Sequence, residues 1–321
     1  MASISWGGPS ELLGEWPSFR ITSMLPLPTS VDQLVDTFAV LPYLEEITWC
    51  NCTPSIAAAI FKFAASRNYF RRLELAVESD WEELDVCTIT SSMGQDIIKW
   101  SRSCQIQKFY LEEFLWESPS LRNQVLGAIV SNPALEELRL FEPHDRTSST
   151  HEAWFDRQTR RLTFGFCDPH GYDHVDVENW GGFFSLFEPV LTTKVSYLRL
   201  TQLDDAGFTM AWTFLAPLVR HSQVEDLSLE FCNISNDDAT EIARAIHDLT
   251  TIRKLTIYGK RPSFEGAKII LKAAPPSLKS EAITIEEKAL TDAFSLEECR
   301  ELQILANERL CTAKVPRLDI D

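Results

Sequence analysis

The sequence lacks the residue patterns that mark most enzymes and metal proteins. Its eight cysteines include a C-x-C at Cys50 and Cys52 but no C-x-x-C pair, so neither a zinc ribbon nor a dithiol redox motif is expected. It has no glycine-rich phosphate loop, no Ser–His–Asp order with a nucleophile elbow, and no prominent carboxylate pair. We therefore predict a non-enzymatic protein without a cofactor or a bound metal.

Signals for export or membrane insertion are also missing. Residues 1–19 contain no Lys or Arg, so a signal peptide would lack its positively charged start. The longest helix-like uncharged run, Ala206 to Val219, is too short to cross a bilayer and is typical of a buried helix. These absences predict a cytoplasmic protein, with the nucleus as the alternative.

Positive charge is scarce. Thirty Lys and Arg stand against 47 Asp and Glu, which gives a net charge of -17. Such a chain repels polyanions, so DNA, RNA and anionic membranes are poor candidate partners. The acidity favours either solubility alone or a basic protein partner, and both interpretations stay open.

What the sequence does contain is a repeat: apolar, two variable, apolar, one variable, apolar. Leu135 to Leu140 is one of the clearest copies. Ten copies are found, and they begin at residues 16, 44, 70, 106, 135, 159, 195, 224, 252 and 280. The fourth and sixth positions are apolar in every copy, from Phe19 and Ile21 to Ile283 and Ile285. Most spacings fall near the upper end of the range for leucine-rich repeats, in which each unit carries a strand and a helix.

The pattern predicts the local structure of each unit. Alternate apolar residues place the fourth and sixth side chains on one face of a short strand. At the ninth position, where the chain turns out of the strand, Cys52, Cys167 and Cys232 are interpreted as buried structural thiols. Helix-like stretches lie between the strands, at 55–66, 120–131, 206–221, 237–248 and 265–274. One amphipathic helix cannot bury its apolar stripe alone, so neighbouring units must stack.

The copies, best seen from Val224 to Ile234, resemble the ribonuclease-inhibitor-like class of leucine-rich repeats. That class includes ribonuclease inhibitor, the Ran GTPase-activating protein and the sensor arms of NOD-like receptors. The resemblance covers roughly residues 16–290. It implies an α/β solenoid, a horseshoe with parallel strands on the concave face and helices on the convex face, and a function in binding other proteins. A GTPase-activating protein like the Ran regulator is the alternative, but no residue can be carried over for it.

The ends of the solenoid are expected to differ from its repeats. Residues 1–15 form a lead-in, and 291–321 form a final helix with a tail. The helix is predicted to cap the array with an apolar side made of Leu296, Cys299, Leu302, Leu305 and Leu310.

Two insertions interrupt the array. The first, at 77–100, gathers acidic residues around Trp81 and is interpreted as a solvated loop, with a contact loop as the alternative. The second irregular zone, at 143–182, holds four of the six histidines, and Cys167, His170 and His174 have a spacing that could suit Zn²⁺. We interpret these as ordinary loop residues, while an enzyme or metal site in this zone stays an alternative.

The candidate binding surface follows from the strand pattern. The third, fifth and seventh residues of a copy point away from the core, and neighbouring copies should align them in columns about 5 Å apart. In the three best copies these residues are Tyr197, Arg199, Thr201, Asp226, Ser228, Glu230, Lys254, Thr256 and Tyr258. Six of them have the aromatic and charged character of interface centres, so we predict a protein-binding site made of Tyr197, Arg199, Asp226, Glu230, Lys254 and Tyr258. The alternative is that they are only solvated strand residues.

Overall fold

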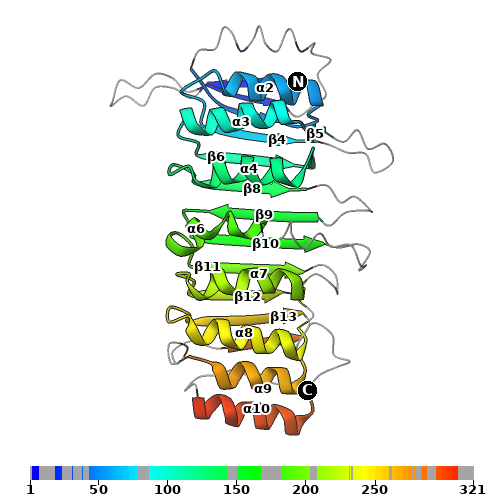
Figure 1. The fold of residues 1–321 in the computed structure, drawn as a ribbon, viewed down its shortest axis with the longest axis vertical. Coiled ribbons are helices and arrows are strands. Elements are labelled where there is room, and N and C mark those ends of the chain that lie inside the picture. Colours follow the sequence, from blue (N-terminus) through cyan, green and yellow to red (C-terminus); the bar gives the residue numbers. More distant parts are fainter. Residues whose placement is uncertain are drawn as a thin grey trace. The chain divides into compact units, whose positions relative to one another are not determined.

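A computed structural model shows a chain of alternating strands and helices (Figure 1). The structure describes residues 2–6, 19–23, 31, 38, 43–77, 87–142, 150–167, 182–202, 208–230, 232, 234–259, 262–275, 278, 283–287 and 294–309. The chain divides into two compact units, Met1–His144 (unit 1) and Asp145–Asp321 (unit 2).

The sheet of unit 1 has one strand for each repeat copy and one further strand, β1, before the first copy. Its strands, in spatial order, are β1 (Ala2–Trp6), β2 (Phe19–Ser23), β3 (Leu44–Trp49), β4 (Arg72–Ala76), β6 (Lys108–Glu112) and β8 (Glu137–Phe141). From β2 to β8 all neighbours are parallel, while β1 pairs with β2 in the antiparallel sense. A second, two-stranded parallel sheet pairs β5 (Cys87–Ile89) with β7 (Phe114–Trp116).

The helices of unit 1 that the structure describes along their whole length are α2 (Pro54–Ala64), α3 (Ser91–Ser103) and α4 (Pro119–Val130), and they lie over one face of its sheet (Figure 1). Each begins at a hydroxyl residue, because Thr53, Thr90 and Ser118 accept a hydrogen bond from the backbone N–H three residues on. Where α3 meets α4 there is no room for a side chain: a Cβ on Gly94 would lie 2.6 Å from Leu121 Cδ1.

Unit 2 repeats the same plan. Its strands, in spatial order, are β9 (Thr150–Asp156), β10 (Arg161–Cys167), β11 (Tyr197–Gln202), β12 (Asp226–Glu230), β13 (Lys254–Gly259) and β14 (Ile283–Glu287). Its helices are α6 (Glu188–Thr193), α7 (Phe208–Arg220), α8 (Asn236–Asp248), α9 (Phe264–Ala273) and α10 (Leu296–Arg309). The strands from β10 to β14 are parallel. No helix in the described part of the chain is both long enough and apolar enough to span a membrane.

The fourth and sixth positions of the repeat form the core, as predicted. In the nine copies that begin at 44 to 280, all of these side chains are buried, and the most accessible, Ile285, is 7% exposed. The strands put these residues in register, so that Leu198, Leu227 and Leu255 are direct neighbours in the sheet. The side chains of the copy at 16 lie outside the described residues.

Two predictions about the sheet and the first insertion need correction. The strands are not all parallel, because β9 pairs with β10 in the antiparallel sense and forms a hairpin within the irregular zone at 143–182. The segment 77–100 is not a loop throughout: it contains β5 and most of α3. Its acidic residues at 78–85 lie outside the described residues. The helix is inconspicuous in the sequence because four apolar side chains, Met93, Ile97, Ile98 and Trp100, suffice for its buried face.

A final helix, α10, follows the repeats, but its buried residues differ from the predicted apolar side. Cys299 and Leu305 are half-buried, and Leu310 lies outside the described residues. Leu302 and Ala306 are buried, together with Phe294 just before the helix, whereas Leu296 is 54% exposed. The buried stripe is set by contact with α9, the neighbouring helix. Because this buried stripe is narrow, Leu296 in the first turn of α10 lies outside it.

A buried ion pair joins helix and strand in unit 1. Arg122 of α4 places Nη1 3.3 Å from Oε1 of Glu142, which follows β8, and both side chains are almost fully enclosed. Removing one partner from such a pair leaves an uncompensated charge in an apolar setting, which is far more costly than removing both.

We therefore expect Arg122→Ala to lower the free energy of unfolding by about 3 kcal/mol. The double variant Arg122→Met/Glu142→Leu should stay within about 1 kcal/mol of the parent, because apolar packing replaces the pair. Urea unfolding followed by circular dichroism measures both. An Arg122→Ala variant as stable as the parent would contradict this account.

Candidate functional site

The side chains that point away from the core form a strand face on each unit. In unit 2 the pairing of β11, β12 and β13 aligns three rows: Tyr197, Asp226 and Lys254; Arg199, Ser228 and Thr256; Thr201, Glu230 and Tyr258. This is the register that the repeat predicts. We call these rows, with their continuation onto β9 and β10, the strand face of unit 2.

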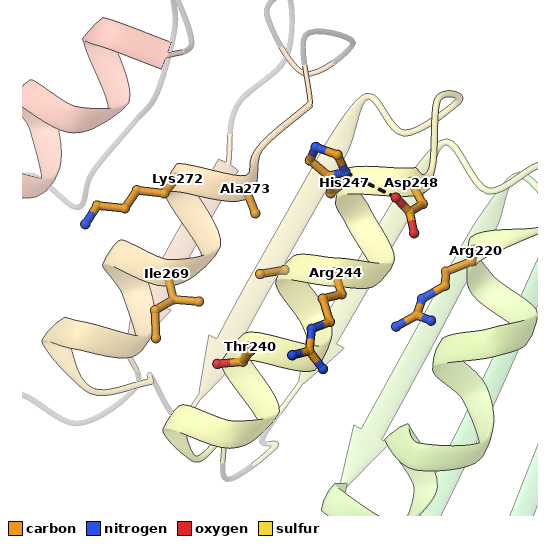
Figure 2. Close-up of a pocket in the computed structure, with 9 residues that line it drawn as sticks. Arg220, Thr240, Arg244, His247, Asp248, Ile269, Lys272 and Ala273 are labelled. Atoms are coloured by element: carbon orange, nitrogen blue, oxygen red, sulfur yellow. Dashed lines mark hydrogen bonds and ion pairs between the residues drawn. The ribbon is translucent and has the colours of Figure 1, made fainter.

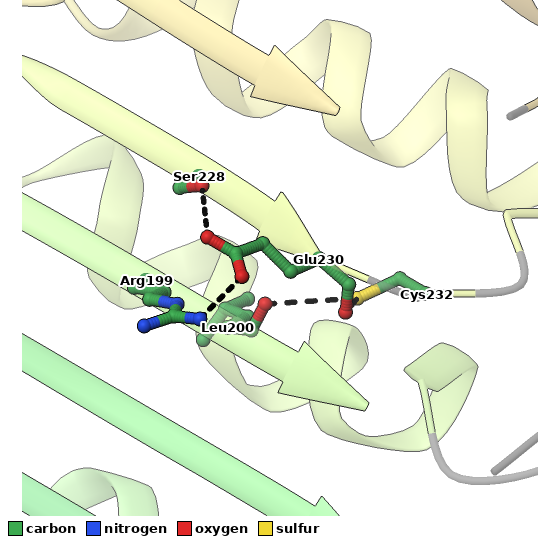
Figure 3. A network of polar contacts seen from close by, with 5 residues as sticks. All are labelled: Arg199, Leu200, Ser228, Glu230 and Cys232. Carbon is green, nitrogen blue, oxygen red and sulfur yellow. Dashed lines mark hydrogen bonds and ion pairs between the residues drawn. The ribbon is translucent and has the colours of Figure 1, made fainter. Parts of the chain in front are cut away.

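The charges on this face are paired across strands. Arg199 donates to Glu230, and Glu230 also accepts a hydrogen bond from Ser228 Oγ at 3.1 Å (Figure 3). Lys254 Nζ lies 3.6 Å from Asp226 Oδ2. Arg199 and Lys254 remain 40% and 45% exposed, so they can make further contacts. The pairs hold their side chains in defined positions while leaving the cations accessible to a partner.

Two residues of this face were missed by the sequence analysis. Arg161 of β10 lies beside Tyr197, with its guanidinium carbon 4.7 Å from the centre of the tyrosine ring. Trp154 of β9 pairs with Thr163 and is 41% exposed. Arg161 is the third residue of the copy at 159, so the repeat could have identified it. Trp154 lies on the antiparallel strand, which follows no repeat, and only the turn residues after Asp156 hint at a hairpin.

A glycine in the middle of β10 leaves room for the side chain of Glu152 on β9. Gly165 faces Glu152 across the antiparallel pair, and a Cβ at this position would lie 2.7 Å from Glu152 Oε2 and 3.0 Å from Glu152 Cβ. The missing side chain therefore lets the carboxylate of Glu152 lie directly on the sheet.

The strand face of unit 1 is more closed. One of its aromatic residues, Tyr110, is buried: Lys108 Nζ lies 4.1 Å and Arg139 Cζ 4.9 Å from the ring centre, and the hydroxyl donates to Glu137. Burial first, and the carboxylate of Glu137 second, raise the pKa of Tyr110 well above its usual value. Because this ring is already enclosed by cations, it has little surface left for a partner.

The helix side offers grooves instead of a face. A groove of about 480 Å³ runs along α8 and α9, with Arg220 of α7 at its border (Figure 2). Arg220 and Arg244 are both paired with Glu241, and His247 with Asp248. A groove of about 460 Å³ occurs between α3 and α4 in unit 1. Since similar grooves occur where repeat helices stack, they are a consequence of stacking and single out no particular ligand.

The histidine-rich zone at 143–182 is described only in part. His144, His170 and His174 lie outside the described residues, and for His151 and Cys167 the structure gives the backbone alone. Among the side chains that are described, no three His, Cys, Asp or Glu residues form a group that could hold a metal ion. The absence of a metal site in this zone therefore stays a prediction.

The two described ninth-position cysteines, Cys52 and Cys232, have the structural role that the sequence suggests. Both are buried, and the thiol of Cys232 donates to the carbonyl oxygen of Glu230 at 3.4 Å and to that of Leu200 at 3.9 Å (Figure 3). Burial raises the pKa of Cys52, with smaller contributions from the nearby thiols of Cys87 and Cys50. Burial also raises the pKa of Cys87 to about 12. At neutral pH these groups are thiols and poor nucleophiles.

Comparison with known proteins gives likeness of fold only. No family model matches the chain, and no curated protein matches it. Similar solved structures include a protein from Bacteroides fragilis, with 14% identity over 83% of this chain and 74% of that chain at a TM-score of 0.38. The leucine-rich repeat-containing protein LegL7 from Legionella pneumophila is similar with 12% identity over 94% of this chain and 92% of that chain, at a TM-score of 0.34. The chain is similar to a leucine-rich repeat protein.

We expect Cys52 and Cys87 to resist iodoacetamide at pH 8 in the folded protein and to react in urea, because their thiolates form only on unfolding. Peptide mass spectrometry measures the modification of each cysteine, with half-buried Cys50 as the internal comparison. Since the folded pKa of Cys87 is about 12 and its ordinary value 9.0, stability should decline as the pH rises from about 9 towards 12. Rapid modification of Cys87 in the folded protein would contradict its assigned burial.

Proposed function

We propose that this protein is a non-enzymatic scaffold that binds a protein partner through the strand face of unit 2. The observation that carries the proposal is the register of β11, β12 and β13, which arranges two tyrosines and four charged residues in adjacent rows. The binding residues are Tyr197, Arg199, Asp226, Glu230, Lys254 and Tyr258, now extended by Arg161 and Trp154. In the ribonuclease-inhibitor-like horseshoe that the repeat predicts, this face is the concave one.

The composition of the face suits protein recognition. Tyrosine, tryptophan and arginine dominate the binding energy of protein interfaces, and all three occur here. The opposite side of each strand is locked into the core by residues such as Leu227 and Leu229, so the exposed side chains stand on a rigid support. Because the support is rigid, these side chains lose less conformational entropy when a partner binds.

The chemistry of the face supports binding more than catalysis. On β10 to β13 its described side chains include no histidine and no cysteine, and Ser228, the serine among them, is buried and donates to a carboxylate. Hydroxyls, rings and paired charges can hold a partner through hydrogen bonds and stacking. None of these groups is arranged as a nucleophile with a general base.

A photo-crosslinking amino acid in place of Thr256, in the middle row of the face, can identify the partner in extracts of the native cell. We then expect Tyr197→Ala and Tyr258→Ala each to weaken binding by about 2 kcal/mol in calorimetric titrations, as loss of a buried aromatic contact does. Tyr69→Ala is the matched control, because this tyrosine is 53% exposed and lies in unit 1.

The variants must keep the melting temperature of the parent for the comparison to hold. Unchanged affinity in both Tyr197→Ala and Tyr258→Ala, with folding preserved, would rule out the strand face of unit 2. The acidic segment at 78–85 would then become the candidate contact surface.

A further inference from the structure

The turn of the β9–β10 hairpin concentrates positive charge at one end of the strand face of unit 2. Three arginines, Arg157, Arg160 and Arg161, lie in or beside this turn, and all are exposed. The nearby carboxylate of Asp156 is engaged in the turn itself: it accepts hydrogen bonds from the N–H of Gln158 at 2.8 Å and from the hydroxyl of Thr159 at 2.8 Å. The carboxylate of Asp156 therefore shapes the turn through its hydrogen bonds to Gln158 and Thr159.

Pairing of β10 with β11 brings a fourth cation to the same place. The backbone N–H groups of Ser196 and Tyr197 donate to the carbonyl oxygen of Arg160, at 2.9 and 3.1 Å. Arg160 in turn directs Nε to the carbonyl oxygen of Lys194, at 3.5 Å. Burial first, and the charge of Arg157 second, lower the pKa of Lys194, so Arg157 and Lys194 are close enough to repel each other. We call Arg157, Arg160, Arg161 and Lys194 the basic corner.

The basic corner differs from the rest of the face in its charge balance. Among the described residues, no carboxylate lies within ion-pair distance of Arg160, Arg161 or Lys194. On the next strands each cation has a carboxylate nearby, as in Arg253 with Glu225 at 3.8 Å and Lys254 with Asp226 at 3.6 Å. Although the chain has a net charge of -17, three cations beside the strand face of unit 2, Arg160, Arg161 and Lys194, have no carboxylate within ion-pair distance among the described residues.

We propose that the basic corner binds carboxylate side chains of an acidic segment in the partner protein. This proposal rests on the proposed function, and it names the chemistry of the partner at one end of that same face. Guanidinium groups bind carboxylates through paired hydrogen bonds, which gives orientation as well as energy. Arg161 connects the two regions, because its guanidinium also covers the ring of Tyr197. The segment would place acidic residues at the hairpin turn and apolar residues along Tyr197 and Trp154.

A short acidic segment fits the corner better than a nucleic acid does. Nucleic acids bind through many phosphate contacts, and their affinity depends on the total charge that the protein neutralises. Four cations on a strongly acidic chain offer few such contacts, and the remaining negative charge repels a polyanion. A few carboxylates can instead lie within the range of about 8 Å over which the corner acts at physiological salt.

The test compares two triple variants with equal changes of charge. Arg160→Gln/Arg161→Gln/Lys194→Gln removes three of the four cations of the basic corner, and Lys62→Gln/Lys99→Gln/Arg300→Gln removes three exposed cations from helices. The probes are a fluorescein-labelled peptide that alternates glutamate and leucine, its glutamine counterpart, and a short oligothymidylate, each titrated by fluorescence anisotropy at low salt. We expect the glutamate peptide to bind the parent and the control, and to bind the corner variant at least about tenfold more weakly. The glutamine peptide should bind all three proteins weakly.

Several results would overturn the proposal. These are no binding of the glutamate peptide to the parent, equal losses in both triple variants, or a tighter corner-dependent affinity for oligothymidylate. The partner identified through Thr256 separates the two proposals: binding that is lost in Tyr258→Ala but kept in the corner variant would retain the face and refute the corner. Binding that survives in both variants would refute the proposed function itself. Circular dichroism and an unchanged melting temperature establish that each variant is folded.

Discussion

Every strand–helix repeat of this protein buries two strand residues against a helix, and that helix cannot bury its apolar stripe alone. A single repeat leaves part of this apolar surface open to water, so each repeat is stable only between neighbouring repeats. The fourth- and sixth-position residues meet this requirement in all nine copies whose side chains are described. Because strand side chains alternate, the same constraint also fixes which residues face outward, and it thereby creates the strand face. The candidate site is therefore made by the outward-facing side chains of the same strands whose inward-facing side chains form the core.

The sequence could predict those parts of the structure that repeat. The alternation of apolar residues predicts the strands from β3 to β14 except β5, β7 and β9, and it places Tyr197, Asp226 and Lys254 in one row. It could not predict β9, because this antiparallel strand belongs to a hairpin with β10 and is not part of the repeat. Helix α3 could not be predicted for a related reason, because it has few apolar residues and directly follows an acidic stretch in the sequence.

The properties of single side chains were harder to foresee. Tyr110, at the fifth position of its copy, and Tyr197, at the third position of its copy, both point away from the core, yet Tyr110 is buried between cations and Tyr197 is only half-buried. That difference depends on the residues of neighbouring strands, such as Lys108 and Arg139, and on how far their long side chains reach. Likewise, the net charge suggests a uniformly acidic molecule. Arg157, Arg160 and Arg161 are close in the sequence, but Lys194 joins them only because β10 pairs with β11.

The hairpin also breaks the translational symmetry of the rows in unit 2. Parallel strands about 5 Å apart present nearly equivalent steps, so an extended partner could slide by one step and make a similar set of contacts. The reversed strand β9 and its turn occur at one end of this ladder and have no counterpart on β11, β12 or β13. A ligand that engages the turn has one alignment in which all of its contacts form, and each shifted alignment loses them. The β9–β10 hairpin thus favours one alignment of an extended partner on the strand face of unit 2, where the parallel strands alone would allow several of nearly equal energy.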